Sequence, residues 1–282
     1  MQRGSQLNLF DQHLHSHNSF DSDADPRRNV ITALNRGLGG LTFTEHFDTH
    51  PTEWAACVYD DEKIDAELNA LRRSFGSEIF IGKGIEVCWQ PQRMDFILDF
   101  LSRHRFDLVM VSVHWAYDKP VHDRRCFDGW PVDRYLSYYL SAVRDATAEI
   151  RRMKARGCQP FHVLGHMDFA RRYARSFFDF DGPMTRMDLI DAILTNCLEA
   201  DLIPEVNTSL LRNRASAPMP GPETMRRYAQ LGGTMMSLGS DAHSSPAVGA
   251  DFDRAVAMLR DAGINREAVF QDGAVTPVPL TQ

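Results

Sequence analysis

Six short apolar segments of this chain resemble β-strands, and each ends in a residue type that can bind a metal ion. In the first segment, Leu9 and Phe10 precede a motif in which His13 and His15 stand two residues apart. Alternate residues of a strand point to the same face, so this pair is able to hold one ion together. The other five runs end at Glu45 with His46, at Glu86, at His114, at His166, and at Asp241 with His243. The simplest common cause is that all of these strand ends open onto one pocket.

Helix-like segments alternate with the strand-like runs. Their apolar residues recur every three or four positions, as Ile64, Leu68 and Leu71 do. We expect strands at residues 7–10 and 203–207 besides the other five runs, and helices at 26–36, 61–75, 94–103, 133–156, 184–200, 222–231 and 251–262. Such alternation predicts a parallel sheet. Because candidate polar residues follow all seven strands, we expect a closed, seven-stranded (β/α) barrel with its site at the C-terminal strand ends.

Length and composition fit one domain of this kind. The chain has 282 residues, and 43% of them are hydrophobic, which is ample for a large core. We find no internal repeat, low-complexity tract or linker, so residues 1–282 are interpreted as a single domain. Residues 272–282, which include Pro277 and Pro279, are expected to be irregular.

Charge and cysteine usage exclude several other classes of protein. The net charge is −7 and no block of lysine or arginine is present, which argues against a nucleic-acid partner. The five cysteines are scattered and never show C-x-x-C spacing, so neither a disulfide framework nor a structural zinc knuckle is indicated. No segment approaches the ~20 apolar residues of a membrane span, and no signal peptide is recognised. We therefore expect a cytoplasmic protein with no membrane partner.

Together, these motifs resemble the polymerase and histidinol phosphatase (PHP) superfamily. The matching segments follow in order and begin at Asp11-Gln-His-Leu-His-Ser, Ser19-Phe-Asp-Ser-Asp, Thr42-Phe-Thr-Glu-His, Gly84-Ile-Glu-Val, Ser112-Val-His, Gly165-His-Met-Asp, Glu205-Val-Asn-Thr-Ser and Gly239-Ser-Asp-Ala-His. The segments around Gly165 and Asn207 look closest to the PHP-type histidinol-phosphate phosphatases. The resemblance implies a distorted, TIM-like barrel that holds up to three divalent metal ions.

Carried over residue by residue, the resemblance also implies nine metal ligands. One ion would be held by His13, His15, Glu86 and Asp241, a second by Glu86, His114 and His166, and a third by Asp21, His46 and His243. Mixed imidazole and carboxylate ligands suit zinc, iron or manganese. Asp23 lies two residues from Asp21 and is the alternative ligand for the third ion, although the resemblance favours Asp21, whose offset from His13 matches the family pattern.

This ligand set implies hydrolysis of a phosphate ester. Bound metals cancel the charge of a phosphate dianion and lower the pKa of water toward ~7, so a metal-bridging hydroxide can attack phosphorus without a protein nucleophile. Glu86 would be the bridging carboxylate of the catalytic centre. His243 or Asp21 would give a proton to the leaving alkoxide, and the sequence does not choose between them.

Binding of the substrate requires fixed positive charge beside the metals. Arg171, Arg172 and Arg212 are the candidates, because guanidinium groups match phosphate oxygens, although each can instead form a surface ion pair. A histidinol-like substrate also carries an ammonium group, for which Asp168 and Glu205 are candidates unless they orient a histidine. The loop at 115–131 contains several aromatic residues, so it either covers the imidazole ring of the substrate or is a packed surface loop.

Three kinds of function follow from these observations. The leading hypothesis is a histidinol-phosphatase of histidine biosynthesis, a phosphomonoesterase that converts L-histidinol phosphate to L-histidinol and phosphate. The second is a related phosphoesterase acting on another small phosphate ester, or a nucleotide phosphodiesterase or exonuclease, which the lack of a basic track disfavours. The third is a barrel that binds ligands without catalysis, which the intact ligand set disfavours. The sequence makes no prediction of oligomeric state.

Overall fold

The computed structural model describes residues 9–53, 55, 57–212 and 215–280. Within these residues, seven parallel strands form one sheet in the order β1-β2-β3-β4-β7-β8-β9. Their bounds are β1 Phe10–Leu14, β2 Gly40–Phe47, β3 Phe80–Cys88, β4 Leu108–Ser112, β7 Val163–Leu164, β8 Ile203–Asn207 and β9 Ser237–Gly239. The order of the strands along the chain is therefore their order in the sheet, as the barrel prediction requires. Residues 7 and 8 of the first predicted strand lie outside the described residues.

The two outer strands of this sheet, β1 and β9, meet at their C-terminal ends and close the barrel. The backbone N–H of Asp241 donates to the carbonyl of His13 at 2.7 Å. The buried carboxylate of Asp11 accepts two further hydrogen bonds, from the N–H groups of Ser240 (2.9 Å) and Gly249 (2.7 Å). We call this junction the β1–β9 seam. It confirms the predicted closure and places two candidate metal ligands from opposite ends of the chain side by side.

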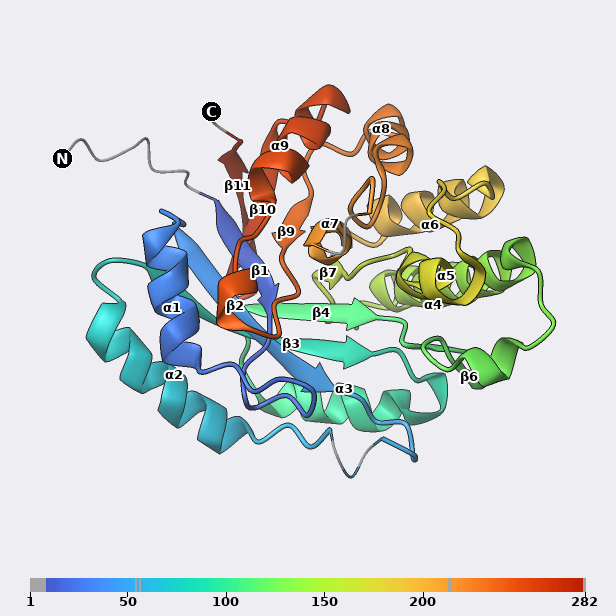
Figure 1. Cartoon of the computed structure of the whole chain (residues 1–282). Helices are drawn as coiled ribbons and strands as arrows, with labels where there is room; N and C mark the ends of the chain where they lie inside the picture. The colour runs from blue at the N-terminus through green and yellow to red at the C-terminus, as the bar shows by residue number, and fades with distance from the viewer. Residues whose placement is uncertain (1–8, 54, 56, 213–214, 281–282) are drawn as a thin grey trace.

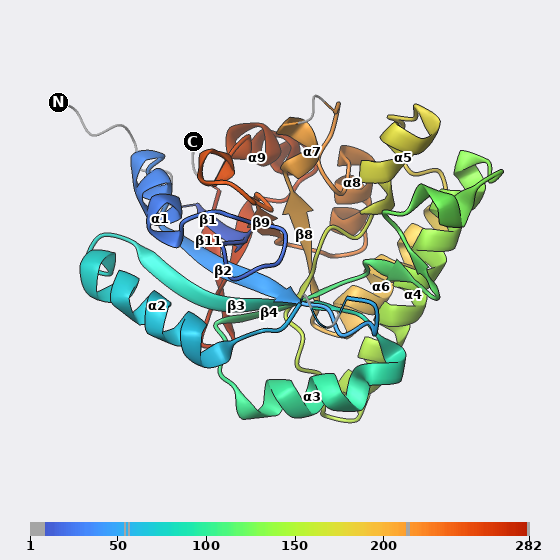
Figure 2. The same ribbon diagram turned by 60° about the horizontal axis from the view of Figure 1, so that its bottom comes forward.

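Helices cover the outside of the barrel, with α1 and α2 on one side and α4, α5 and α6 on the other (Figure 1). Their bounds are α1 Pro26–Asn35, α2 Asp61–Phe75, α3 Met94–Arg103, α4 Val132–Ala155, α5 Ala170–Phe178, α6 Met187–Glu199, α7 Ser209–Arg212, α8 Pro222–Gln230 and α9 Phe252–Asp261. Figure 2 shows α3 beside β3 and β4, between α2 and α4. Every helix that the sequence predicts is present with ends shifted by a few residues at most, whereas α5 and α7 were not predicted.

The packing explains why the strands are so apolar. Every residue of β2 and of β4 is buried, as expected for parallel strands that carry helices on one face and the barrel interior on the other. On α2, Ile64, Leu68 and Leu71 form the buried face, and the Asp60 side chain caps the first turn by accepting from the N–H of Lys63. Within the described residues, no helix is long and apolar enough to cross a membrane.

The C-terminal segment is a β-hairpin, which corrects the expectation that residues 272–282 are irregular. Its antiparallel strands are β10 (Arg266–Gln271) and β11 (Ala274–Pro279). Ala268 and Phe270 of β10 pack against the first residues of β4, β7 and β8 and so help to fill the N-terminal end of the barrel. Pro277 and Pro279 belong to β11, an outer strand, where a missing N–H is tolerated. The prolines therefore marked an edge strand, and residues 281 and 282 lie outside the described residues.

Gln12 joins this hairpin to the barrel. Its side chain is buried, and Nε2 donates to the carbonyl of Ala268 (2.6 Å) and to the hydroxyl of Ser237 (3.0 Å). Its Oε1 accepts from the N–H of Phe270 at 2.8 Å. One amide thus connects β1, β9 and β10. Because buried polar groups are costly when unpaired, this contact matters more than a hydrogen bond at the surface.

We predict that Gln12→Leu destabilises the protein. The substitution keeps an apolar side chain of similar size but leaves the carbonyl of Ala268 and the N–H of Phe270 buried without partners, so the free energy of unfolding should fall by about 3 kcal/mol. Urea denaturation measures the change. The matched control is Gln92→Leu at an exposed position, which should alter stability by less than about 0.5 kcal/mol. A similarly small change in Gln12→Leu would contradict this role.

Candidate active site

The C-terminal ends of the barrel strands surround a polar cavity of about 100 Å³. Seven of the nine candidate metal ligands line it, namely Asp21, His46, Glu86, His114, His166, Asp241 and His243. The other two, His13 and His15, are completely buried next to Glu86. A larger cavity of about 970 Å³ includes residues at the opposite ends of β3 and β4, and none of the candidate ligands lines it.

Glu86, on β3, stands at the centre of the cluster. Its Oε1 lies 2.9 Å from Nε2 of His166 and 3.3 Å from Nε2 of His114. Its Oε2 lies 3.1 Å from Nδ1 of His46, 3.4 Å from Nε2 of His13 and 3.5 Å from Nε2 of His15. The sheet register contributes directly, because His46 on β2 is the partner of Glu86 in the β2–β3 pairing. Both oxygens of a single buried carboxylate thus face histidine rings from several strands.

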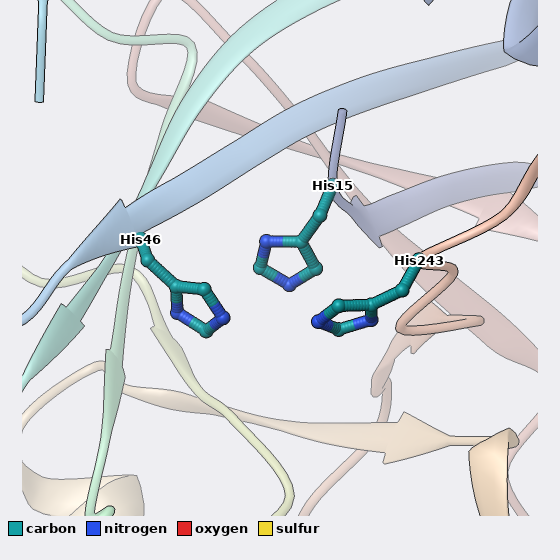
Figure 3. Close-up of side chains that lie close together, drawn as sticks. All are labelled: His15, His46 and His243. Atoms are coloured by element: carbon teal, nitrogen blue, oxygen red, sulfur yellow. The ribbon is translucent and has the colours of Figure 1, made fainter. Parts of the chain in front are cut away.

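A second grouping lies next to the first. Figure 3 shows the rings of His15, His46 and His243 turned toward one another, and one nitrogen of each lies within 4.8 Å of the others. The carboxylate of Asp21 lies 3.0 Å from Nε2 of His243 and 3.5 Å from Nε2 of His46. Asp23 is exposed to solvent, and it is Asp21 that lies against these two histidines. The geometry therefore favours Asp21 for the third metal position, which stays a prediction.

Hydrogen bonds behind the rings decide which nitrogen faces the cavity. Nδ1 of His13 lies 2.7 Å from the carboxylate of Glu205, and Nδ1 of His114 lies 2.9 Å from that of Asp48. A carboxylate accepts only, so Nδ1 carries the hydrogen in the neutral form of both rings. Nε2 is then left as a lone pair that points toward Glu86, the orientation that a metal ligand requires.

His15 is oriented by a short chain of hydroxyl and carboxylate groups. Its Nδ1 lies 3.1 Å from Oγ of Ser19, and that hydroxyl donates to Glu45 at 2.5 Å. Glu45 also accepts from the N–H and the hydroxyl of Ser16. Since the hydrogen of the Ser19 hydroxyl is used for Glu45, its oxygen accepts from Nδ1–H of His15. The Nε2 lone pair of His15 is therefore also directed at the cluster.

The residues fit a metal centre. Among the described residues, Nε2 of His13, Nε2 of His15, Nδ1 of His46 and Oε2 of Glu86 are buried and have no hydrogen-bond partner. Buried polar atoms are normally paired, and lone pairs of neutral imidazole and carboxylate repel one another unless a cation lies between them. These atoms are also the ligand types that zinc, iron and manganese accept. The donor atoms and their geometry therefore fit a metal-binding centre.

Burial and the charges of neighbouring side chains together set the pKa values within the cluster. Burial alone would lower the pKa of His13, but the negative charges of Glu205 and Glu86 raise it well above the usual value. Burial, together with the neighbouring His46, lowers the pKa of His15 to about 3. Burial would raise the pKa of Glu86, yet the surrounding histidines, His13 first, hold it well below the usual range. The bridging candidate is therefore ionised and able to attract cations.

Asp241 connects the cluster to an arginine. It has a φ of 51°, a left-handed conformation that is uncommon for residues other than glycine. One carboxylate oxygen lies 3.6 Å from Nε2 of His15, and the other accepts from the guanidinium of Arg172. The same guanidinium donates to the hydroxyl of Ser209 at 2.6 Å. Arg172 thus lies beside the candidate ligands and lines the cavity.

The structure does not bring the other predicted substrate-binding residues to this cavity. Arg171 is buried, pairs with Asp168 at 3.1 Å, and both line a different cavity of about 240 Å³. Arg212 donates to the backbone carbonyls of Ser240 and Asp241, so it supports the segment that carries Asp241. Glu205 orients His13, as described above, and this is the alternative that the sequence left open.

Two acidic residues near the cluster were missed by the sequence analysis. Asp48 stands two residues after His46, and the same alternation that singled out His13 and His15 would have identified it. Glu53 lines the cavity from the segment between β2 and α2 and follows no strand, so no periodic signal marks it.

Comparisons with known proteins show the family to which this chain is related. Residues 11–209 match the family model described as PHP domain. A probable histidinol-phosphatase of Deinococcus radiodurans is 27% identical over 280 residues, covering 95% of this chain and 99% of that protein. The histidinol-phosphatase of Lactococcus lactis is 26% identical over 279 residues, covering 94% of this chain and 95% of that protein.

A solved structure shares the fold. It is histidinol phosphate phosphatase from Lactococcus lactis, complexed with zinc, L-histidinol and phosphate, with a TM-score of 0.80, 23% identity, and coverage of 95% of this chain and 99% of that one. From the family match over most of its length, the chain belongs to the PHP domain family. Asp241 and His243 lie beyond the matched range and are joined to the cluster by the β1–β9 seam.

We predict that Glu86→Gln lowers the metal content of the purified protein by one equivalent or more. The amide has nearly the same shape, but it loses the negative charge on which the surrounding nitrogens converge. Elemental analysis of the variant measures the loss. The control is Glu78→Gln, at an exposed position just before β3, which should retain the metal content of the wild type. Full metal content in Glu86→Gln would rule out the central role of this carboxylate.

Proposed function

We propose that this protein is a metal-dependent phosphomonoesterase that hydrolyses L-histidinol phosphate to L-histidinol and inorganic phosphate. The observation that carries the proposal is the convergence of histidine rings on Glu86 in a PHP-family chain. Relatives named histidinol-phosphatase that align with almost the whole chain support the choice of substrate. The Lactococcus structure, which contains zinc, L-histidinol and phosphate, supports the same choice.

We propose that the centre takes two to three divalent ions, of zinc, iron or manganese. The candidate sets are His13, His15, Glu86 and Asp241 for the first ion, Glu86, His114 and His166 for the second, and Asp21, His46 and His243 for the third. The ring of His15 also faces His46 and His243, so it stands between the first and third sets. When bound, such ions neutralise phosphate charge and lower the pKa of water toward neutrality.

The remaining tasks belong to side chains of the protein. Arg172 is proposed as the group that binds the phosphate, because it lines the cavity and its guanidinium can give two parallel hydrogen bonds. Asp21 and His243 are more exposed than the buried ligands, at 37% and 29% of their side chains. Burial opposes the charged ring of His243, but Asp21 and Asp241 raise its pKa above the usual value. Burial would raise the pKa of Asp21, but His243 and His46 lower it. His243 is therefore the better candidate for giving a proton to the oxygen of the leaving alcohol.

A substrate comparison tests the proposed reaction. With the same metal supply, the protein should release phosphate from L-histidinol phosphate with a kcat/KM roughly 100-fold above that for a mononucleotide, a difference of about 2.7 kcal/mol. A dinucleotide should not be cleaved. Removal of metal with a chelator should abolish the release, and added metal should restore it. Preference for either nucleotide would instead identify a nucleotide phosphoesterase.

We predict that Arg172→Lys raises KM for L-histidinol phosphate. Lysine keeps the positive charge next to Asp241 but loses the planar fork, which should cost about 2 kcal/mol, or roughly 30-fold in kcat/KM. Arg175→Lys on the same helix is the control, because Arg175 does not line the cavity. Steady-state kinetics with unchanged metal content measures the effect. A change of less than about threefold, or under 0.7 kcal/mol, would remove Arg172 from the binding site.

A further inference from the structure

Among the described carboxylates that line the active-site cavity, Glu53 is the one without an ion-pair partner. The other acids that line the cavity are all paired: Asp21 and Glu86 with histidines, Asp48 with His114, and Asp241 with Arg172. Within the described part of the chain, the polar contact of the Glu53 side chain is the indole N–H of Trp115, which donates to Oε2 at 2.7 Å. An indole carries no charge, so the described residues form no ion pair with the Glu53 carboxylate.

The position of Glu53 is held by stacked aromatic rings. Trp115 is largely buried and stacks on His50. The centroids of the two rings are 3.4 Å apart, and the angle between the ring planes is 14°. Nδ1 of His50 lies 2.7 Å from the hydroxyl of Thr52. Trp115 also follows His114 directly in the chain. The indole N–H therefore fixes Glu53 relative to a candidate metal ligand.

This arrangement suits a cation that arrives with the substrate. The ionised form of a carboxylate is destabilised in a partly desolvated cavity that holds other acids. It is stabilised most by a positively charged group that it binds directly. L-Histidinol phosphate carries an ammonium group on the carbon next to the CH2 group that bears the phosphate ester. The acidic residues that the sequence suggested for this group, Asp168 and Glu205, are committed to Arg171 and His13.

We propose that Glu53 binds the ammonium group of the substrate, with Trp115 as the residue that positions its carboxylate. This inference rests on the proposed function and adds a determinant of specificity to it. Glu53 selects amino-substituted phosphate esters, whereas the metals and Arg172 act on the phosphate that all such esters share. Loss of Glu53 therefore affects recognition of the amine rather than metal binding.

The test compares L-histidinol phosphate with its analogue that lacks the amino group, at about pH 8, where a free imidazole with a pKa near 6.5 is neutral and an alkylammonium is charged. In Glu53→Gln, the ratio of kcat/KM for the two esters should fall about tenfold or more, mainly through KM. The affinity for L-histidinol, measured by calorimetry, should fall by a similar factor. Trp115→Phe, which keeps the ring but removes the N–H, should lower the same ratio to a smaller extent.

The matched control is Glu62→Gln, which makes the same change at an exposed position on α2. It should keep the wild-type ratio. An unchanged ratio in Glu53→Gln, with wild-type metal content, would overturn the role of Glu53 while leaving the proposed function intact. A wild-type protein that hydrolyses neither ester would overturn the proposed function, and this inference with it.

Discussion

The negative charge of Glu86 is the constraint on which the rest of the site depends. A fully buried carboxylate is costly unless positive charge surrounds it, and here the surrounding groups are histidine rings that can take either a proton or a metal ion. Bringing those rings to one point requires the strand ends of β1, β2, β3 and β4 and the segment after β7 to face the same cavity. A closed barrel provides this, because its strands all point their C-terminal ends toward one mouth.

Around the rings lies a second group of acids that serves a different purpose. Glu205 and Asp48 each bind the outer nitrogen of a ring, and Glu45 binds the hydroxyl of Ser19 next to a ring. These contacts select the tautomer that presents Nε2 to the cluster. The acids of the site therefore divide by position. Those at the centre attract cations, those behind the rings orient them, and Glu53 at the side faces the space left for substrate.

The sequence was sufficient for the parts of the fold that repeat. Alternating strands and helices predicted the barrel, and the strand ends predicted the candidate ligands that meet around Glu86. It was insufficient where geometry depends on distant contacts. Whether Arg171 or Arg172 faces the cavity is decided by rotation along one short helix, and no periodic pattern reveals it. Pro277 and Pro279 suggested irregular structure, but pairing with β10 made an edge strand.

The β1–β9 seam has a consequence for how this protein is made. His13 leaves the ribosome long before Asp241, and the proposed metal centre uses both residues. A nascent chain that has released only its early strands can offer separate histidines to a passing ion but cannot enclose it. Under the proposed function, tight metal capture is thus postponed until β9 docks, and a chain without β9 has no complete catalytic centre.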